Sequence, residues 1–335
     1  MDKTTPTAPE TKTPLPVGYT LRPWRTGDDM EMLQYWHDPE NRQVAAFRSS
    51  FSPDTDAPFS RTLVAEHQGV PVAAGTIYET DLHPQRLWAY LEVAPDHRRT
   101  GLGNHLIAAL KHAAQAAPSG ISAFRTKVEP ASSGLEFAQA QGFEVIQRSR
   151  MVRIEAGTVP PVPLRQDASE RMTQTIEDLA TGSVELTQRF WEFYRGIHGW
   201  DQPADLSIGR VNRLFLSDEA EALGAVVLRD DILRAQAEGK KGDILAFAVS
   251  YRPLAVDAGL MEISEDDATE ITVGYRLGHP QAREAIMQLL SVMTGQYAVS
   301  LEVDDSMEDL AVLIDQLIKM GSAKVTSQTL VIADA

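Results

Sequence analysis

The chain of 335 residues contains no cysteine. It therefore has no disulfide framework, no thiolate nucleophile and no cysteine-based metal site. No apolar run approaches the roughly 20 residues of a transmembrane helix. Residues 1–16 are polar and rich in threonine and proline, which predicts a disordered tail and not a signal peptide. We therefore expect a soluble, cytoplasmic protein without a membrane partner.

Basic residues are also scarce, with 31 Lys and Arg against 47 Asp and Glu and a net charge of -16. The imbalance lies in residues 156–335, which carry 15 basic and 29 acidic residues, whereas residues 1–155 carry 16 and 18. Binding of nucleic acid requires clustered Lys and Arg, so we do not expect it. The acidic half would suit a cationic substrate such as an amine, or it only keeps the protein in solution.

Three common motifs are missing as well. The eight histidines form no HExxH pair, so no metal is expected. Gly239-Lys240-Lys241 does not supply the Gly-Lys-Ser/Thr of a P-loop. Leu106 stands where a dinucleotide-binding turn would have its third glycine.

One turn nevertheless has the composition of an anion-binding site. An alternating apolar strand is predicted over 87–93, a helix over about 102–115, and Arg98-Arg99-Thr100-Gly101-Leu102-Gly103 connects them. The two glycines permit backbone conformations closed to other residues and a close approach of a ligand. The N–H groups of the turn and the positive end of the helix dipole then face the anion.

With Val93-Ala94-Pro95 before it, this turn resembles the acyl-CoA signature of the GCN5-related N-acetyltransferase (GNAT) family. That signature is Arg/Gln-x-x-Gly-x-Gly/Ala after a strand that ends in Val-x-Pro. The resemblance implies that acetyl-CoA binds here, with its pantetheine arm along Val93, Ala94 and Pro95. Arg98 and Arg99 would contact phosphates or are solvated loop charges. The pyrophosphate would lie on the segment that continues through Thr100, Gly101, Leu102, Gly103 and Asn104.

The chain is long enough for two such domains, at roughly 150 residues each. We expect a GNAT domain over 17–156, a proline-rich linker over 157–165, and a degenerate second GNAT-like domain over 166–335. Each would be an α/β domain with a mixed, mostly antiparallel sheet flanked by helices. Tandem members of the family include mycothiol synthase, but there the second copy is the catalytic one.

The element order supports this division. In the first half we predict strands over 19–22, 61–66, 72–78, 87–93, 121–128, 143–145 and 151–154, with helices near 28–36, 102–115 and 133–141. In the second half we predict a helix-rich region over 167–216, strands over 224–228, 243–251, 269–277 and 297–303, helices over 281–294 and 306–320, and closing strands at 324–325 and 330–332. The second half has no Gly-x-Gly after its strand at 269–277, and Glu284 would oppose a pyrophosphate, so we expect no acyl-CoA site there.

The catalytic residues are less well defined by the sequence. Glu92 ends the cofactor strand, where family members often place a carboxylate that acts as general base. Tyr90 shares its strand face and is the second candidate, and Glu79 and Glu129 are alternatives. The family's tyrosine acid is replaced by Ala138, and its asparagine by Ala131. Water or another side chain would then protonate the leaving thiolate, or the protein does not catalyse.

The sequence therefore predicts an N-acetyltransferase that moves an acetyl group from acetyl-CoA to a primary amine of a small molecule or a polypeptide. The alternative is a non-catalytic acyl-CoA-binding or scaffolding protein. The identity of the acceptor and the oligomeric state stay open at this point.

Overall fold

The computed structural model describes residues 14–39, 42–252 and 268–334. The chain forms two compact units. The first comprises Met1–Lys127, Ser133–Glu144 and Ile332–Ala335, and the second comprises Val128–Ser132 and Val145–Val331. No helix within the described ranges could span a bilayer. Most of the tail expected over 1–16 lies outside the described residues, but Leu15 packs on the core of the first unit.

The sheet of the first unit has the order β1-β3-β4-β5-β6, and the short β2 pairs with β3. Its strands are β1 (Tyr19–Pro23), β2 (Thr55–Asp56), β3 (Phe59–His67), β4 (Val70–Tyr78), β5 (Leu87–Val93) and β6 (Phe124–Val128). The pairs from β1 to β5 are antiparallel, whereas β5 and β6 are parallel. The strand expected over 121–128 thus begins at Phe124.

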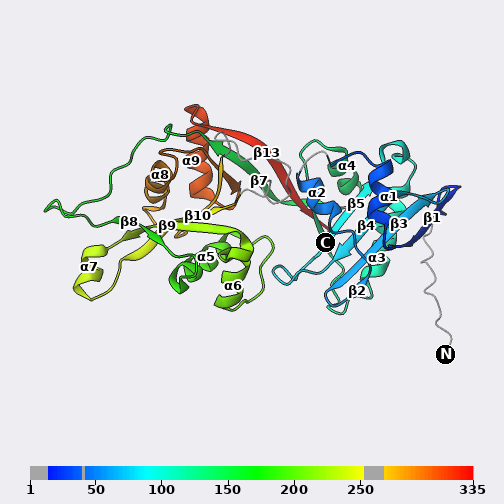
Figure 1. Cartoon of the computed structure of the whole chain (residues 1–335), viewed down its shortest axis with the longest axis horizontal. Coiled ribbons are helices and arrows are strands. Elements are labelled where there is room, and N and C mark those ends of the chain that lie inside the picture. Colours follow the sequence, from blue (N-terminus) through cyan, green and yellow to red (C-terminus); the bar gives the residue numbers. More distant parts are fainter. Residues whose placement is uncertain (1–13, 40–41, 253–267, 335) are drawn as a thin grey trace. The chain divides into compact units, whose positions relative to one another are not determined.

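Helices cover both faces of this sheet (Figure 1). They are α1 (Asp28–Tyr35), α2 (Arg42–Arg48), α3 (Leu102–Ala114) and α4 (Ser133–Ala140). Val64 and Ala74 pack with Met32 and Trp36 on the α1 side. The neighbouring residues Ala65 and Ala73 pack with the α3 side chains Leu102 and Leu106. Because strand side chains alternate between the faces, neighbouring residues of β3 and β4 supply apolar side chains to both helix layers.

The sheet of the second unit has the order β13-β7-β12-β11-β10-β9-β8. Its strands are β7 (Glu144–Ile154), β8 (Thr175–Leu179), β9 (Ala222–Asp230), β10 (Asp243–Tyr251), β11 (Thr269–Tyr275), β12 (Val299–Asp304) and β13 (Ala323–Ala333). Its helices are α5 (Val184–Ile197), α6 (Ile208–Phe215), α7 (Ile232–Ala237), α8 (Ala282–Met293) and α9 (Glu308–Lys319). In Figure 1, α5 and α6 lie on one side of β10, and α8 and α9 lie on the other. The order of elements repeats that of the first unit.

Two strands differ from the sequence-based expectation. Residues 144–154 form one strand, β7, instead of two short strands, and it pairs antiparallel with β12 of the second unit. Residues 323–333 likewise form the single strand β13, and its last residues belong to the first unit. The Asp334 N–H donates there to the Phe124 oxygen at 3.1 Å. These pairings join residues far apart in the chain, which local patterns do not reveal.

The proline-rich segment at 157–165 is packed into the second unit. Val159 is buried in its core, and the Gly157 N–H donates to the Thr294 oxygen at 2.7 Å. The compact units therefore divide near residue 144, before this segment. The region 167–216, for which the sequence predicts mostly helix, also contains the strand β8. The short helices α2 and α7 were not predicted.

A buried arginine ties strands to the first helix in each unit. In the first unit, Arg22 on β1 bonds Asp28 at the start of α1, with both N···O distances at 2.7 Å, and also bonds Glu66 on β3. In the second unit, Arg229 on β9 bonds Glu185 near the start of α5 and Glu177 on β8. This arrangement occurs in both units, although the arginine lies on the first strand of the β1–β3 pair and on the second strand of the β8–β9 pair. It supports the expectation of two similar domains.

A glycine in the core of the second unit generates a stability prediction. A Cβ at Gly274 on β11 would collide with the ring of Phe247, which is fully buried. Gly274→Ala should therefore lower the free energy of unfolding by about 1 to 3 kcal/mol, the usual cost of overpacking. The control is Gly224→Ala on β9, where a Cβ would meet no described atom within 4 Å. The prediction would be contradicted if urea denaturation showed the same decrease in the free energy of unfolding for both variants.

Candidate functional site

The strand β5 separates from its parallel neighbour β6 after two residues. Only Leu87 and Trp88 pair with Phe124 and Arg125 of β6. On its other side β5 stays paired with β4 as far as Val93. Residues 89–93 therefore have an edge without a strand partner in the described part of the chain.

The direction of the backbone groups on this edge follows from two hydrogen bonds. The Leu87 N–H donates to Ala123 on the β6 side, and the Ala94 N–H donates to Val72 on the β4 side, both at 2.9 Å. Since successive strand residues alternate, the N–H groups of Leu91 and Val93 point toward the open side. An extended ligand can pair with such an edge like an added strand.

The turn after β5 has the geometry expected of an anion-binding site. Helix α3 begins at Leu102, and its N-cap Gly101 has φ = +91°. Arg99 also adopts a left-handed conformation, with φ = +64°. Within the described ranges, the N–H groups of residues 99–103 donate to no backbone carbonyl. They are available to an anion at the positive end of the α3 dipole.

A close approach of two helices explains the second glycine. A Cβ at Gly103 would lie 3.1 Å and 3.2 Å from two ring carbons of Phe137 on α4. The Gln141 amide next to α4 also donates to the Asn104 side chain at 3.0 Å. Residue 103 therefore needs a small side chain to keep α4 beside the turn.

A cavity of about 970 Å³ extends along the open edge and the turn. Ten of the twelve residues predicted for the site line it: Tyr90, Glu92, Val93, Pro95, Arg98, Arg99, Gly101, Leu102, Gly103 and Asn104. Ala94 and Thr100 are not among its described lining residues. Ala94 is buried against the α1 side of the sheet, and the Thr100 hydroxyl donates to the His97 carbonyl at 2.7 Å.

The two arginines of the turn differ in their contacts. Arg98 Nε donates to the carbonyl of Val93 at 3.0 Å. This bond connects the turn at 98–103 to the end of β5, so Arg98 positions the edge instead of only presenting a charge. Arg99 is exposed and lines the cavity, which leaves it available to a phosphate.

At the other end of the cavity, Glu92 is held by a bidentate ion pair. Arg48 Nε donates to Glu92 Oε2 at 2.8 Å, and Arg48 Nη2 donates to Glu92 Oε1 at 2.7 Å. The Tyr90 hydroxyl donates to Glu92 Oε2 at 2.7 Å. The carboxylate is therefore fixed by three charge-assisted hydrogen bonds.

The helix α2 covers the β5 face that carries these residues. Phe47 stacks on the Tyr90 ring, with centroids 4.9 Å apart and an interplanar angle of 8°. Burial, and then the charge of Glu92, raise the pKa of Tyr90 well above its ordinary value. The phenol therefore stays protonated and donates to Glu92, which suits it to orient this carboxylate and not to act as a base.

Sequence reasoning missed Arg48, the charged partner of Glu92. It ends the seven-residue helix α2, and 44 residues separate it from Glu92. His37 and Asp38 also line this end of the cavity and were not predicted. No local pattern marks these residues, because their roles follow from the packing of α2 on β5.

The alternative catalytic residues Glu79 and Glu129 are not among the described residues that line the cavity. Glu129 belongs to the second unit. Ala138 is a buried residue of α4, so no hydroxyl acts from that position. Among the described residues, no group of three or more His, Cys, Asp or Glu could hold a metal ion.

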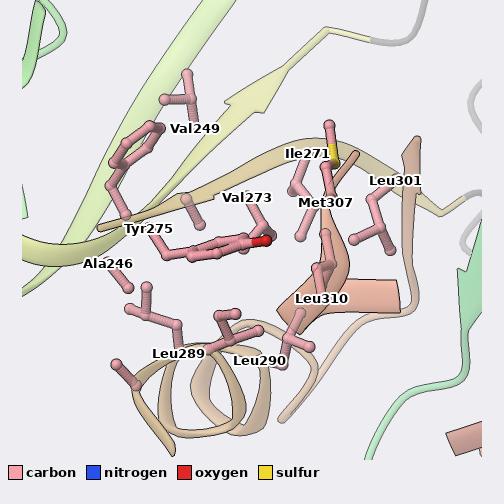
Figure 2. Close-up of a cluster of buried hydrophobic side chains, with 14 of the residues drawn as sticks. Ala246, Val249, Ile271, Val273, Tyr275, Leu289, Leu290, Leu301, Met307 and Leu310 are labelled. Atoms are coloured by element: carbon pink, nitrogen blue, oxygen red, sulfur yellow. The ribbon is translucent and has the colours of Figure 1, made fainter. Parts of the chain in front are cut away.

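The second unit repeats the strand geometry but fills the corresponding space. β11 and β12 are parallel and pair only at Thr269–Val299 and Glu270–Ser300. Beside β11, Tyr275 points toward Met307 and Leu310 within an apolar cluster (Figure 2). Burial raises the pKa of Tyr275 to about 12. Glu284 in the first turn of α8 pairs with Arg165 at 2.8 Å.

The chain was compared with known proteins. Residues 23–143 match the model of the acetyltransferase (GNAT) family. No curated protein sequence matches the chain.

Among solved structures, a GCN5-related N-acetyltransferase from Sphaerobacter thermophilus is similar over 96% of both chains, at 15% identity and a TM-score of 0.58. A tandem GNAT protein from the clavulanic acid biosynthesis pathway is similar over 94% of this chain and 98% of its own, at 12% identity and a TM-score of 0.54. These likenesses show that the fold extends over both units.

The Glu92 ion pair generates a prediction that concerns stability alone. Arg48 and Glu92 are only 17% and 15% exposed. Glu92→Gln should therefore lower the free energy of unfolding by about 1 to 3 kcal/mol, because it leaves a mostly buried guanidinium without its counter-charge. Glu136→Gln, at an exposed cavity-lining carboxylate, should change it by less than about 0.5 kcal/mol. Equal thermal denaturation midpoints for Glu92→Gln and the unchanged chain would contradict this.

Proposed function

Because residues 23–143 match the model of the acetyltransferase (GNAT) family, we propose that the protein transfers an acetyl group from acetyl-CoA to a primary amine of a small molecule or a polypeptide. The family supports acyl transfer from an acyl-CoA donor in general. The observation that carries the proposal is the open edge of β5 beside the available N–H groups of the turn.

The groups that line the cavity match the chemistry of an acyl-CoA. The N–H groups of residues 99–103 would hold the pyrophosphate, with Arg99 as an additional cation. The open edge at Leu91 and Val93 would pair with the amide-containing pantetheine arm. The thioester would then lie near Glu92, the residue between Leu91 and Val93.

Acetyl-CoA supplies the thioester whose carbonyl carbon the amine attacks. Glu92 accepts the proton of the acceptor ammonium, directly or through water, and Tyr90 and Arg48 orient its carboxylate. A strand N–H at Leu91 or Val93 stabilises the negative charge that develops on the carbonyl oxygen. A C–N bond forms as the C–S bond breaks. With Ala138 in place of a tyrosine, water protonates the thiolate.

Positioning supplies most of the rate in this scheme. Fixing an amine against a thioester can lower the barrier by about 7 to 11 kcal/mol. Arg98 contributes by fixing the end of β5 to the turn.

A second candidate function is a non-catalytic acyl-CoA-binding or scaffolding protein. Ala138 favours it, because the family's acid is missing there. This protein would bind acetyl-CoA without transferring the acetyl group to any amine. Binding and turnover therefore have to be measured separately.

The first prediction concerns binding. Calorimetric titration with acetyl-CoA should show one site per chain. Gly101→Glu should abolish binding, because it adds a negative charge and a side chain at a left-handed residue of the turn. Gly278→Glu is the matched control, since Gly278 is also left-handed, with φ = +70°, but lies in the second unit. Two sites, or equal losses in both variants, would show that the second unit also binds the cofactor.

The second prediction concerns catalysis. Glu92→Gln should lower kcat/KM at pH 7 by about 100-fold or more, as expected for loss of a general base, and should change the Kd for acetyl-CoA less than threefold. Thiol release with an amine acceptor measures kcat/KM, and calorimetry measures the Kd for acetyl-CoA. Glu136→Gln is again the control. Unchanged turnover in Glu92→Gln would exclude Glu92 as the base.

A further inference from the structure

We infer that the acceptor is a small zwitterion of the amino-acid type, with its carboxylate bound by Arg48 and its ammonium group bound by Glu92. This inference rests on the proposed function and names the substrate class of the same cavity. It starts from the hydrogen-bonding capacity of Arg48 and Glu92, both of which line the cavity.

Arg48 has more donors than its partners use. A guanidinium carries five N–H donors. Two of them bond Glu92, and Nη1 donates a third to the carbonyl of His37 at 2.7 Å. The Tyr90 hydroxyl also hydrogen-bonds Arg48, so one donor remains without a partner in the described part of the chain. A carboxylate is the ligand that a planar guanidinium binds best.

The position and charge of Arg48 are fixed by its surroundings. Its guanidinium carbon lies 5.5 Å from the centre of the Trp36 ring. The bonds from Glu92 raise the pKa of Arg48 more than burial lowers it, so the group is a permanent cation. It is therefore pre-organised to bind an anion.

Glu92 retains one acceptor site. A carboxylate offers about four lone-pair positions. Oε2 accepts from Arg48 Nε and from Tyr90, and Oε1 accepts only from Arg48 Nη2. The remaining position on Oε1 can take an N–H of an ammonium group. That amine would lie beside the open edge of β5, where the thioester is expected.

The spare donor on Arg48 and the spare acceptor position on Glu92 belong to groups of opposite charge that form one ion pair. A zwitterion with its charges a few bonds apart can contact both sites at once. A polyamine carries no carboxylate, so it would leave the spare donor of Arg48 without a ligand. Arg48 therefore argues against the cationic acceptor that the acidic composition suggested.

The experiment compares acceptors that differ only in the carboxylate. Glycine, leucine, phenylalanine and glutamate are each tested against the corresponding α-amide, and cadaverine and spermidine represent amines without a carboxylate. Thiol release from acetyl-CoA gives kcat/KM for each acceptor. We expect at least one amino acid to exceed its amide by 10-fold or more, and both polyamines to be poor acceptors.

Substitution of Arg48 tests whether this residue causes the preference. In Arg48→Gln the kcat/KM ratio between an amino acid and its amide should fall below threefold. In Arg48→Lys the ratio should be intermediate, because lysine keeps the positive charge but lacks the planar set of N–H donors. Arg61→Gln is the matched control, because Arg61 pairs with Asp56 at 2.6 Å outside the cavity and should keep the ratio. Thermal denaturation and acetyl-CoA titration verify that each variant is folded.

The outcomes separate this inference from the function on which it rests. Turnover of amides or polyamines equal to that of amino acids, or an unchanged ratio in Arg48→Gln, overturns the inference and leaves the acetyltransferase intact. Acetyl-CoA binding without turnover of any amine overturns the inference and favours the non-catalytic alternative. If the chain without substitutions does not bind acetyl-CoA, both the inference and the proposed function are overturned.

Discussion

The site depends on one constraint, which is that β5 and β6 pair as parallel strands for only two residues. A strand edge leaves backbone donors and acceptors that need a partner. In most sheets the next strand supplies it, but here the strands diverge and the backbone of residues 89–93 faces a cavity. The turn at 98–103 follows four residues after the end of this strand, and three of these residues, Pro95–His97, form a 3-10 helix. The edge and the anion site are thus adjacent because they are close together in the chain.

The second unit has the same strand geometry but a filled space beside it. β11 and β12 also pair at only two positions, but Tyr275, Met307 and Leu310 occupy the space beside β11. The turn there lacks the paired glycines, and Glu284 is engaged by Arg165. The same framework is therefore compatible with an open, polar cavity in one copy and with an apolar core in the other.

Local features could be predicted from the sequence, and long-range ones could not. The strand at 87–93, the glycine turn and the start of α3 at Leu102 are confirmed, because alternation, turn residues and helical spacing are local signals. Arg48 was missed because its role depends on a short helix that packs on β5. The assignment of β7 failed for a similar reason, since its partner Val299–Asp304 follows 145 residues after Ile154. The roles of Glu92 and Tyr90 stay predictions.

The strand β13 has a consequence for how the protein is made. Its last residues complete the first unit, where Asp334 joins Phe124 and forms an ion pair with Lys111 at 3.0 Å. Domains usually fold in order as the chain emerges from the ribosome, the N-terminal one first. Here the N-terminal unit can assemble most of its sheet early, but it lacks its final contacts until residue 334 has been synthesised. During translation, β6 is left with an edge that a chaperone or another nascent chain could bind.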